Sequence, residues 1–180
     1  MADNITKEEL AKKRDYSGEI DLRNLLMATV LEARGEGEEG MFAVARSIHN
    51  RKNLITKGKV LPSTFMPYSK NKNPTYTDII TYKGQYEVYD DKRKGFKPQK
   101  SPITQNDIDV GKRAMMIALN DDAAKKYIQE KSLDPRIYHV TGFRGKTAKF
   151  DASQQKEKFI FRNHIFNLAG SPFAEQYKNK

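Results

Sequence analysis

The sequence contains no cysteine and no tryptophan. The absence of cysteine excludes disulfides, thiol nucleophiles and thiolate metal ligands. No apolar run approaches the ~18 residues of a membrane span. The opening stretch, MADNITKEELAKKRD, also lacks the apolar segment of a secretory signal. We therefore expect a protein that is made in the cytoplasm without a signal peptide and that does not insert into a membrane.

Acidic residues are outnumbered by basic ones. The chain has 33 Lys and Arg against 23 Asp and Glu, a formal net charge of +10. This excess predicts attraction to a polyanion such as nucleic acid, an anionic lipid surface or the acidic polymers of a bacterial wall. No recognition-helix, zinc-finger or RNA-binding pattern accompanies the basic residues. Charge alone therefore indicates an anionic partner without identifying it.

Apolar spacing predicts a mainly helical α+β fold. We expect an N-terminal arm or short helix within 1–17, one compact domain over 18–170, and a tail at 171–180. The strongest helix signal covers 20–34 and ends at two glycines. Its apolar stripe comprises Leu22, Leu25, Leu26, Thr29, Val30 and Ala33.

The rest of the chain divides less evenly. Further helices are predicted at 38–51, 104–121 and 122–131, and short strands at 136–142 and 158–167. The interval 52–105 contains five prolines and predicts long loops, with one strand-like piece at 84–90.

A group of glutamates follows the strongest helix. Helical geometry places Glu32 about 20° from Leu25, at the border of the buried stripe. Partial loss of hydration there is expected to raise its pKa, as a general acid near neutral pH requires. Pairing with Arg34 or Arg46 is the alternative. Solvation and helix-start electrostatics account for the other three glutamates, Glu36, Glu38 and Glu39.

The segment ATVLEARGEGEEGMFAVARSIHNR, at 28–51, resembles the signature of the SleB-type cell wall hydrolases, the spore-cortex-lytic family. Two later pieces follow in the family's order. KGQYEVYDD at 83–91 resembles its Gly-Gln-Phe-Ser segment, and IYHVTG with FRNHIF resembles its Tyr-His and Gly-Asn-His-Val-Phe strands. Departures are Glu87 in place of serine, Arg162 in place of glycine, the missing Pro-x-Trp and an insertion over 52–80.

The resemblance implies a lysozyme-like single domain with a small strand element. It also implies cleavage of the β-1,4 bond between N-acetylmuramic acid and N-acetylglucosamine in peptidoglycan, without a cofactor. On this reading Glu32 is the catalytic acid/base of a lytic transglycosylase. It protonates the leaving oxygen and then, as a carboxylate, helps the muramoyl 6-hydroxyl to close an anhydro ring. A second carboxylate, from Glu36, Glu87 or Asp90, would instead make a hydrolytic muramidase.

Other residues have side chains suited to binding a glycan. Amides match acetamido groups, and tyrosine rings can stack on sugars. The candidates are Glu36, Gln85, Tyr86, Glu87, Tyr138, His139 and Asn163. Tyrosines in strands can also be core filling, and Asn163 can serve only to turn a hairpin. We expect His49 and His164 to be structural. A metal site built from His139, His164 and Glu87 has no motif spacing to support it, so we expect no metal.

The partners expected are peptidoglycan glycan strands and the anionic wall surface, with the chain acting as a monomer. A wall enzyme without a signal peptide is typical of a phage endolysin released through a holin or carried in a virion. Two alternatives remain: a basic nucleic-acid-binding module, in which aromatic residues among lysines stack on bases, and a catalytically silent relative that only binds glycan.

Overall fold

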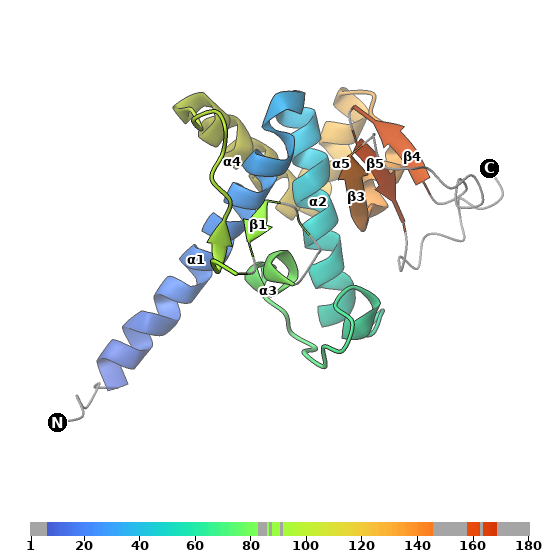
Figure 1. The fold of residues 1–180 in the computed structure, drawn as a ribbon. Helices are drawn as coiled ribbons and strands as arrows, with labels where there is room; N and C mark the ends of the chain where they lie inside the picture. Colours follow the sequence, from blue (N-terminus) through green and yellow to red (C-terminus); the bar gives the residue numbers. More distant parts are fainter. Residues whose placement is uncertain are drawn as a thin grey trace.

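The computed structural model describes residues 7–82, 86, 88–90, 92–145, 158–162 and 164–168. This part of the chain is mainly helical with short strands, as the sequence predicted. In chain order (Figure 1) the elements are α1 (Lys7–Ala33), η1 (Arg34–Glu36), α2 (Gly37–Thr56), η2 (Pro62–Thr64), α3 (Tyr76–Thr81), β1 (Tyr89–Asp90), β2 (Gly95–Phe96), α4 (Gln105–Leu119), α5 (Asp121–Glu130), η3 (Pro135–His139), β3 (Gly142–Gly145), β4 (Lys158–Phe161) and β5 (His164–Asn167), where η denotes a 3-10 turn.

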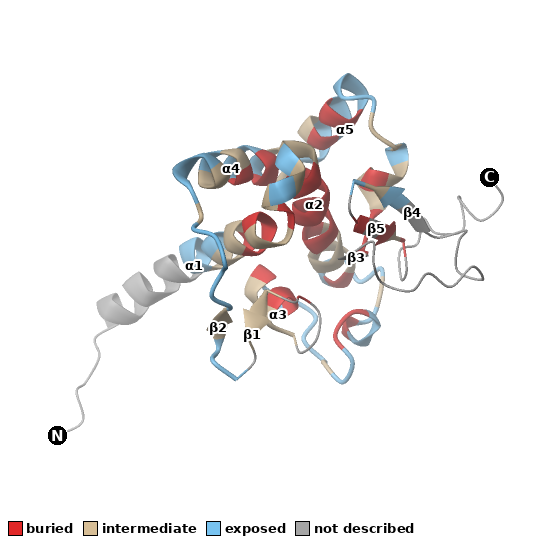
Figure 2. Cartoon of the chain, turned by 45° about the horizontal axis from the view of Figure 1, so that its top comes forward, coloured by how far each residue is buried: buried red, intermediate tan, exposed pale blue. Residues whose placement is uncertain are grey.

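Helix α2 lies at the centre of the fold. Every residue from Gly40 to His49 is buried, and α1, α3 and α4 all pack against this helix (Figure 2). A helix that is buried all round has to carry apolar or small side chains on every face. The run GMFAVARSIH meets that requirement except at Arg46 and His49, which therefore need polar partners inside the core.

Helix α1 is longer than predicted. The short helix expected within 5–15 and the strong one at 20–34 form a single helix, whose N-terminal part projects beyond the other elements (Figure 1). Gly18 does not break it, since one glycine costs a helix only about 1 kcal/mol. Leu25, Val30 and Ala33 are buried as expected, but Leu22 is 42% exposed. The buried stripe therefore begins one turn later than its periodicity indicates.

The interval 52–105 is more ordered than predicted. It contains η2 and α3, and α3 begins at a capping box in which Thr75 and Asp78 bond each other's backbone N–H groups. Buried side chains from Pro62 to Ile80 fasten this stretch to the core. Of the strand-like piece at 84–90, the described residues 89–90 form β1, which pairs with β2 in a short hairpin. Sequence reasoning missed these elements because each is too short to show a period.

The second sheet has the order β3-β5-β4 and is antiparallel throughout. Two predictions here are corrected. Residues 136–142 are not a strand, because Pro135 starts the 3-10 turn η3, capped by the Asp134 side chain. Residues 158–167 contain two strands, β4 and β5, which pair antiparallel with the backbone of residue 159 opposite that of residue 166.

Gly111 sets the contact between α4 and α1. A Cβ atom at this position would lie 2.5 Å from Cγ2 of Val30 and 3.0 Å from Cδ1 of Leu26. Gly111→Ala should therefore lower the free energy of unfolding by roughly 1–3 kcal/mol through overpacking, although alanine favours helix. Gly18→Ala in α1 is the matched control, because nothing lies within 4 Å of its added methyl group. It should raise the same quantity by about 0.5–1 kcal/mol.

Equilibrium denaturation of the two variants measures both effects. If both substitutions stabilise the fold, α1 and α4 are not in close contact at Gly111.

Among the described residues, no helix has the length and apolar character needed to cross a membrane.

Candidate functional site

Glu32 is the penultimate residue of α1 and lies half-buried where that helix meets the β1 segment. Its Oε1 is 3.4 Å from the backbone nitrogen of Val88, at the outer limit of a hydrogen bond. The border position predicted from helical geometry is confirmed. The alternative prediction, an ion pair between Glu32 and Arg34 or Arg46, is not confirmed. Arg34 donates to the carbonyls of Ser101 and Pro102, and Arg46 binds other partners inside the core.

Tyr86 lies beside Glu32 and is 5% exposed. Burial is the main cause that raises the pKa of its phenol, and the charge of Glu32 acts in the same direction, while the nearby Arg51 opposes both. The hydroxyl has no hydrogen-bond partner among the described residues. The Ser47 hydroxyl lies nearby, where it lowers the Tyr86 pKa slightly, and it donates to the Val44 carbonyl at 2.8 Å. Tyr86 is thus a neutral, buried donor next to the candidate acid.

Glu36 corrects the sequence analysis, which placed it in solvent. Its side chain is 6% exposed, and Oε1 lies 2.5 Å from Nδ1 of His164, itself 9% exposed by side chain. Gly40 permits this position, since a Cβ there would come within 2.5 Å of Cβ of Glu36. His164 is buried, as a structural histidine should be, but its partner is a carboxylate from the opposite end of the domain sequence.

Phe143 joins the two carboxylates into one site. Its ring centroid is 5.7 Å from that of Tyr86 and 5.2 Å from that of His164. The partly buried Phe143 ring therefore links Tyr86, which lies near Glu32, to His164, which pairs with Glu36. We call this set the Glu32 site: Glu32, Glu36, Tyr86, Phe143 and His164.

The turn between β4 and β5 is fastened to the start of α2. Arg162 forms an ion pair with Glu39, which lies three residues, about one turn, after Glu36, the partner of His164. The backbone of Arg162 has φ 56°, the left-handed region that glycine adopts most readily. Arg162 occupies this conformation without being glycine, and its side chain is held by the ion pair with Glu39.

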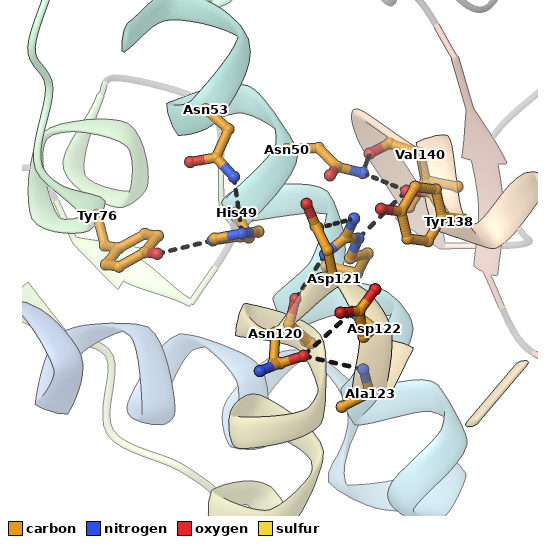
Figure 3. A network of polar contacts seen from close by, with 12 residues as sticks. His49, Asn50, Asn53, Tyr76, Asn120, Asp121, Asp122, Ala123, Tyr138 and Val140 are labelled. Atoms are coloured by element: carbon orange, nitrogen blue, oxygen red, sulfur yellow. Dashed lines mark hydrogen bonds and ion pairs between the residues drawn. The ribbon is translucent and has the colours of Figure 1, made fainter. Parts of the chain in front are cut away.

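Tyr138 belongs to a second polar cluster with Asn50 and Asp121 (Figure 3), and the centroid of the His139 ring lies 4.9 Å from that of Tyr138. The Arg46 guanidinium carbon lies 4.2 Å from the centroid of the Tyr138 ring, and Arg46 also pairs with Asp121 at 2.7 Å. Asn50 donates to the carbonyls of Tyr138 and Val140, which holds η3 against α2. Burial, assisted by the charges of Arg46 and Lys125, lowers the pKa of His139 and keeps it neutral. Packing against α2 accounts for Tyr138.

The side chain of Asp90, which was named as a possible second carboxylate, forms hydrogen bonds within the β1–β2 hairpin. Its Oδ1 accepts from the backbone N–H groups of Lys92 and Arg93. These bonds lower its pKa and hold it as a carboxylate at the exposed turn. The remaining predicted residues, Gln85, Glu87 and Asn163, lie outside the described residues.

Two groups around the Glu32 site were not found from the sequence. Arg51 places its guanidinium carbon 5.6 Å from the centroids of both Tyr86 and Phe65. The other is the Val88 backbone N–H, which no side-chain pattern could indicate. Arg51 is the last residue of the Asn-Arg motif in the sequence. Its position about four turns after Glu36, on a largely buried helix, is the signal that could have placed it near the site. Within the described residues no group of three or more His, Asp and Glu side chains could hold a metal ion.

In comparisons with protein families, curated proteins and solved structures, no family model, protein or structure matches this chain.

Proposed function

We propose that the protein cleaves peptidoglycan glycan strands between N-acetylmuramic acid and N-acetylglucosamine as a lytic transglycosylase, with Glu32 as the single acid/base. The observation that carries the proposal is the placement of the Glu32 carboxylate. It is half-exposed at the end of α1, within reach of a polymer, and stands against a buried tyrosine and a backbone N–H. We extend the proposal to a lysozyme-like fold and to action at the bacterial wall as a phage-encoded endolysin.

The surroundings of Glu32 suit a group that first gives up a proton and then takes one back. The carbonyl end of α1 and partial burial both favour the protonated acid. The Val88 N–H favours the carboxylate that remains after proton transfer. An acid whose two forms are each stabilised by a different neighbour can serve both half-reactions of ring closure.

Two of the three candidate second carboxylates, Glu36 and Asp90, are engaged by other groups, which supports this mechanism over hydrolysis with two carboxylates. Glu36 is almost fully buried and paired with His164, so water and sugar have little access to it. Asp90 is bound within its own turn. A hydrolytic muramidase needs a second carboxylate on the far side of the scissile bond, and neither of these two is presented for that role.

Digestion of purified sacculi tests the proposal. We expect soluble muropeptides that carry an anhydro-muramic end, each one water lighter than the hydrolytic product, and unchanged activity in the presence of a chelator. Products of full hydrolytic mass would instead indicate a muramidase. No release of muropeptides by the folded protein would mean that the Glu32 site does not cleave glycan.

A further inference from the structure

The loop between α2 and α3 is fixed in place although it has little regular structure. Four of its side chains are buried in the core: Pro62, Phe65, Met66 and Pro74. Backbone bonds tighten it at both ends of η2, from Thr64 to Leu61 and from Met66 to Pro62. Side chains that point outward from this loop are therefore held in defined positions. We call residues 57–73 the Tyr68 loop.

Tyr68 occupies a backbone conformation that tyrosine disfavours. The Ser69 N–H donates to the Met66 carbonyl at 2.9 Å, which closes a four-residue turn with Pro67 in its second position. Tyr68 stands third, with φ 72°, where such a turn normally requires glycine or asparagine. Its side chain is 98% exposed, so burial of the ring does not offset the strain. Strain of this kind is found where a side chain is displayed for a function.

The segment that carries the Tyr68 ring is strongly basic. Residues 52–77 include five lysines and no acidic residue. Lys57, Lys59, Lys70 and Lys72 of the loop are all exposed. Within the described part of the chain, none of these four takes part in an ion pair. The loop thus offers a flat aromatic face together with cations that are free to meet an anionic ligand.

The Tyr68 loop adjoins the Glu32 site. The rings of Phe65 and Tyr86 both lie 5.6 Å from the guanidinium carbon of Arg51, one from the loop and one from the site. Phe65 is three residues before Tyr68 in the same rigid stretch. We take a strand bound at the Glu32 carboxylate to be long enough to reach the exposed side of this loop.

We propose that the Tyr68 loop is an outer subsite for the glycan strand, with the Tyr68 ring stacked on a sugar and the lysines facing the carboxylates of the stem peptides. A tyrosine ring presents a flat apolar face of the kind that sugar rings stack on, with a polar tip. The stem peptides of peptidoglycan carry free carboxylates along the strand, which matches a loop with lysines and no acid. This inference rests on the proposed function, because it takes the ligand to be the strand that Glu32 cleaves.

Co-sedimentation with purified sacculi tests the subsite, using Glu32→Gln protein so that the ligand stays intact. Adding Tyr68→Gly should weaken binding by about tenfold, the loss expected for one well-placed aromatic contact. Tyr68→Phe keeps the ring and should bind like the parent. The melting temperature of Tyr68→Gly should equal that of the parent or exceed it by about 1–4 °C, because glycine relieves the strained turn. A lower melting temperature would mean a structural role for Tyr68 and would overturn the proposal.

The lysines are tested by a charge-matched pair of double variants. Lys70→Glu with Lys72→Glu should weaken binding to sacculi, whereas Lys100→Glu with Lys112→Glu, exposed elsewhere, should weaken it far less. Equal loss in both would assign the effect to net charge and overturn the subsite.

Two further results separate this inference from the proposed function. If the wild-type protein cleaves sacculi and Tyr68→Gly binds them unchanged, cleavage stands and the subsite is wrong. If Tyr68→Gly instead weakens binding to single-stranded oligo(dT) and not to sacculi, the loop recognises nucleic acid and the proposal is overturned.

Discussion

Glu32→Gln is expected to slow lysis of sacculi by about 10²–10⁴-fold while the protein stays folded. Glutamine keeps the shape of the side chain and can still face the Val88 N–H through its amide oxygen. It cannot deliver a proton, so the leaving sugar oxygen has to depart without assistance. The loss should lie at the upper end of this range, because one residue serves both proton transfers. Turbidity loss of a sacculus suspension measures the rate, and circular dichroism checks the fold.

Glu38→Gln is the matched control. Glu38 lies six residues away in the first turn of α2, where its carboxylate pairs with Arg113 at 3.0 Å on the surface. Surface pairs of this kind contribute only about 0–1 kcal/mol to stability, and activity should be near normal. If Glu32→Gln lyses sacculi as fast as Glu38→Gln does, Glu32 is not the acid.

Glu36→Gln separates chemistry from folding. Because the Glu36 side chain is buried against His164, we expect a loss of stability larger than that of Glu38→Gln. A Glu36→Gln protein that is stable but inactive would transfer the role of acid to Glu36.

Acid should destabilise the protein through His49, by about 3 kcal/mol between pH 6.5 and pH 4. Burial is the main cause that lowers the pKa of His49 to about 4, assisted by the charges of Arg46, Lys52 and Lys57 and opposed by Asp121. The folded-state pKa lies below the unfolded value of about 6.5, so unfolding takes up a proton in this window. The contribution to stability is therefore complete above pH 6.5 and is lost as the pH falls toward 4.

The contacts of His49 agree with a neutral ring (Figure 3). Asn53 donates to Nε2 at 2.7 Å, which requires that nitrogen to be without a proton. The network then assigns the proton to Nδ1, which donates to the Tyr76 hydroxyl at 2.8 Å. Protonation of Nε2 would set two donors against each other in the core.

Denaturant unfolding at several pH values between 4.5 and 7.5 measures this effect. The free energy of unfolding of the wild type should fall across that range, and that of His49→Gln should fall less, from a lower starting value. An equally steep fall in both proteins would show that other groups cause the acid sensitivity.

The helices that the sequence predicted correctly carry their signals locally. Helix α4 begins at a capping box between Thr104 and Asp107, four residues that determine one another's conformation without help from the rest of the chain. The border position of Glu32 followed from the same kind of argument, because the angle between residues on a helix depends only on their spacing.

The predictions that failed depend on contacts between distant segments. Leu22 fits the apolar period, but 42% of its surface is exposed. The local sequence predicts that Glu36 is a solvated turn residue. In the structure it is buried against His164, which lies 128 residues later in the sequence. Periodicity reports which face of an element is apolar, and it contains no information on what comes to lie against that face.

The ion pair between Arg162 and Glu39 joins positions 123 residues apart. The pair between His164 and Glu36 joins the same two regions. Both pairs at the start of α2 can therefore form only after the last strands of the domain have been synthesised. Helices α1, α2 and α4 can collapse on one another as soon as they have been made, since their contacts need no later segment. The series of side chains from Tyr86 through Phe143 to His164 is complete only when the final hairpin docks. A nascent or C-terminally shortened chain would therefore contain Glu32 but lack the contacts that His164 and Arg162 make. The complete site would form only once the last hairpin had been translated.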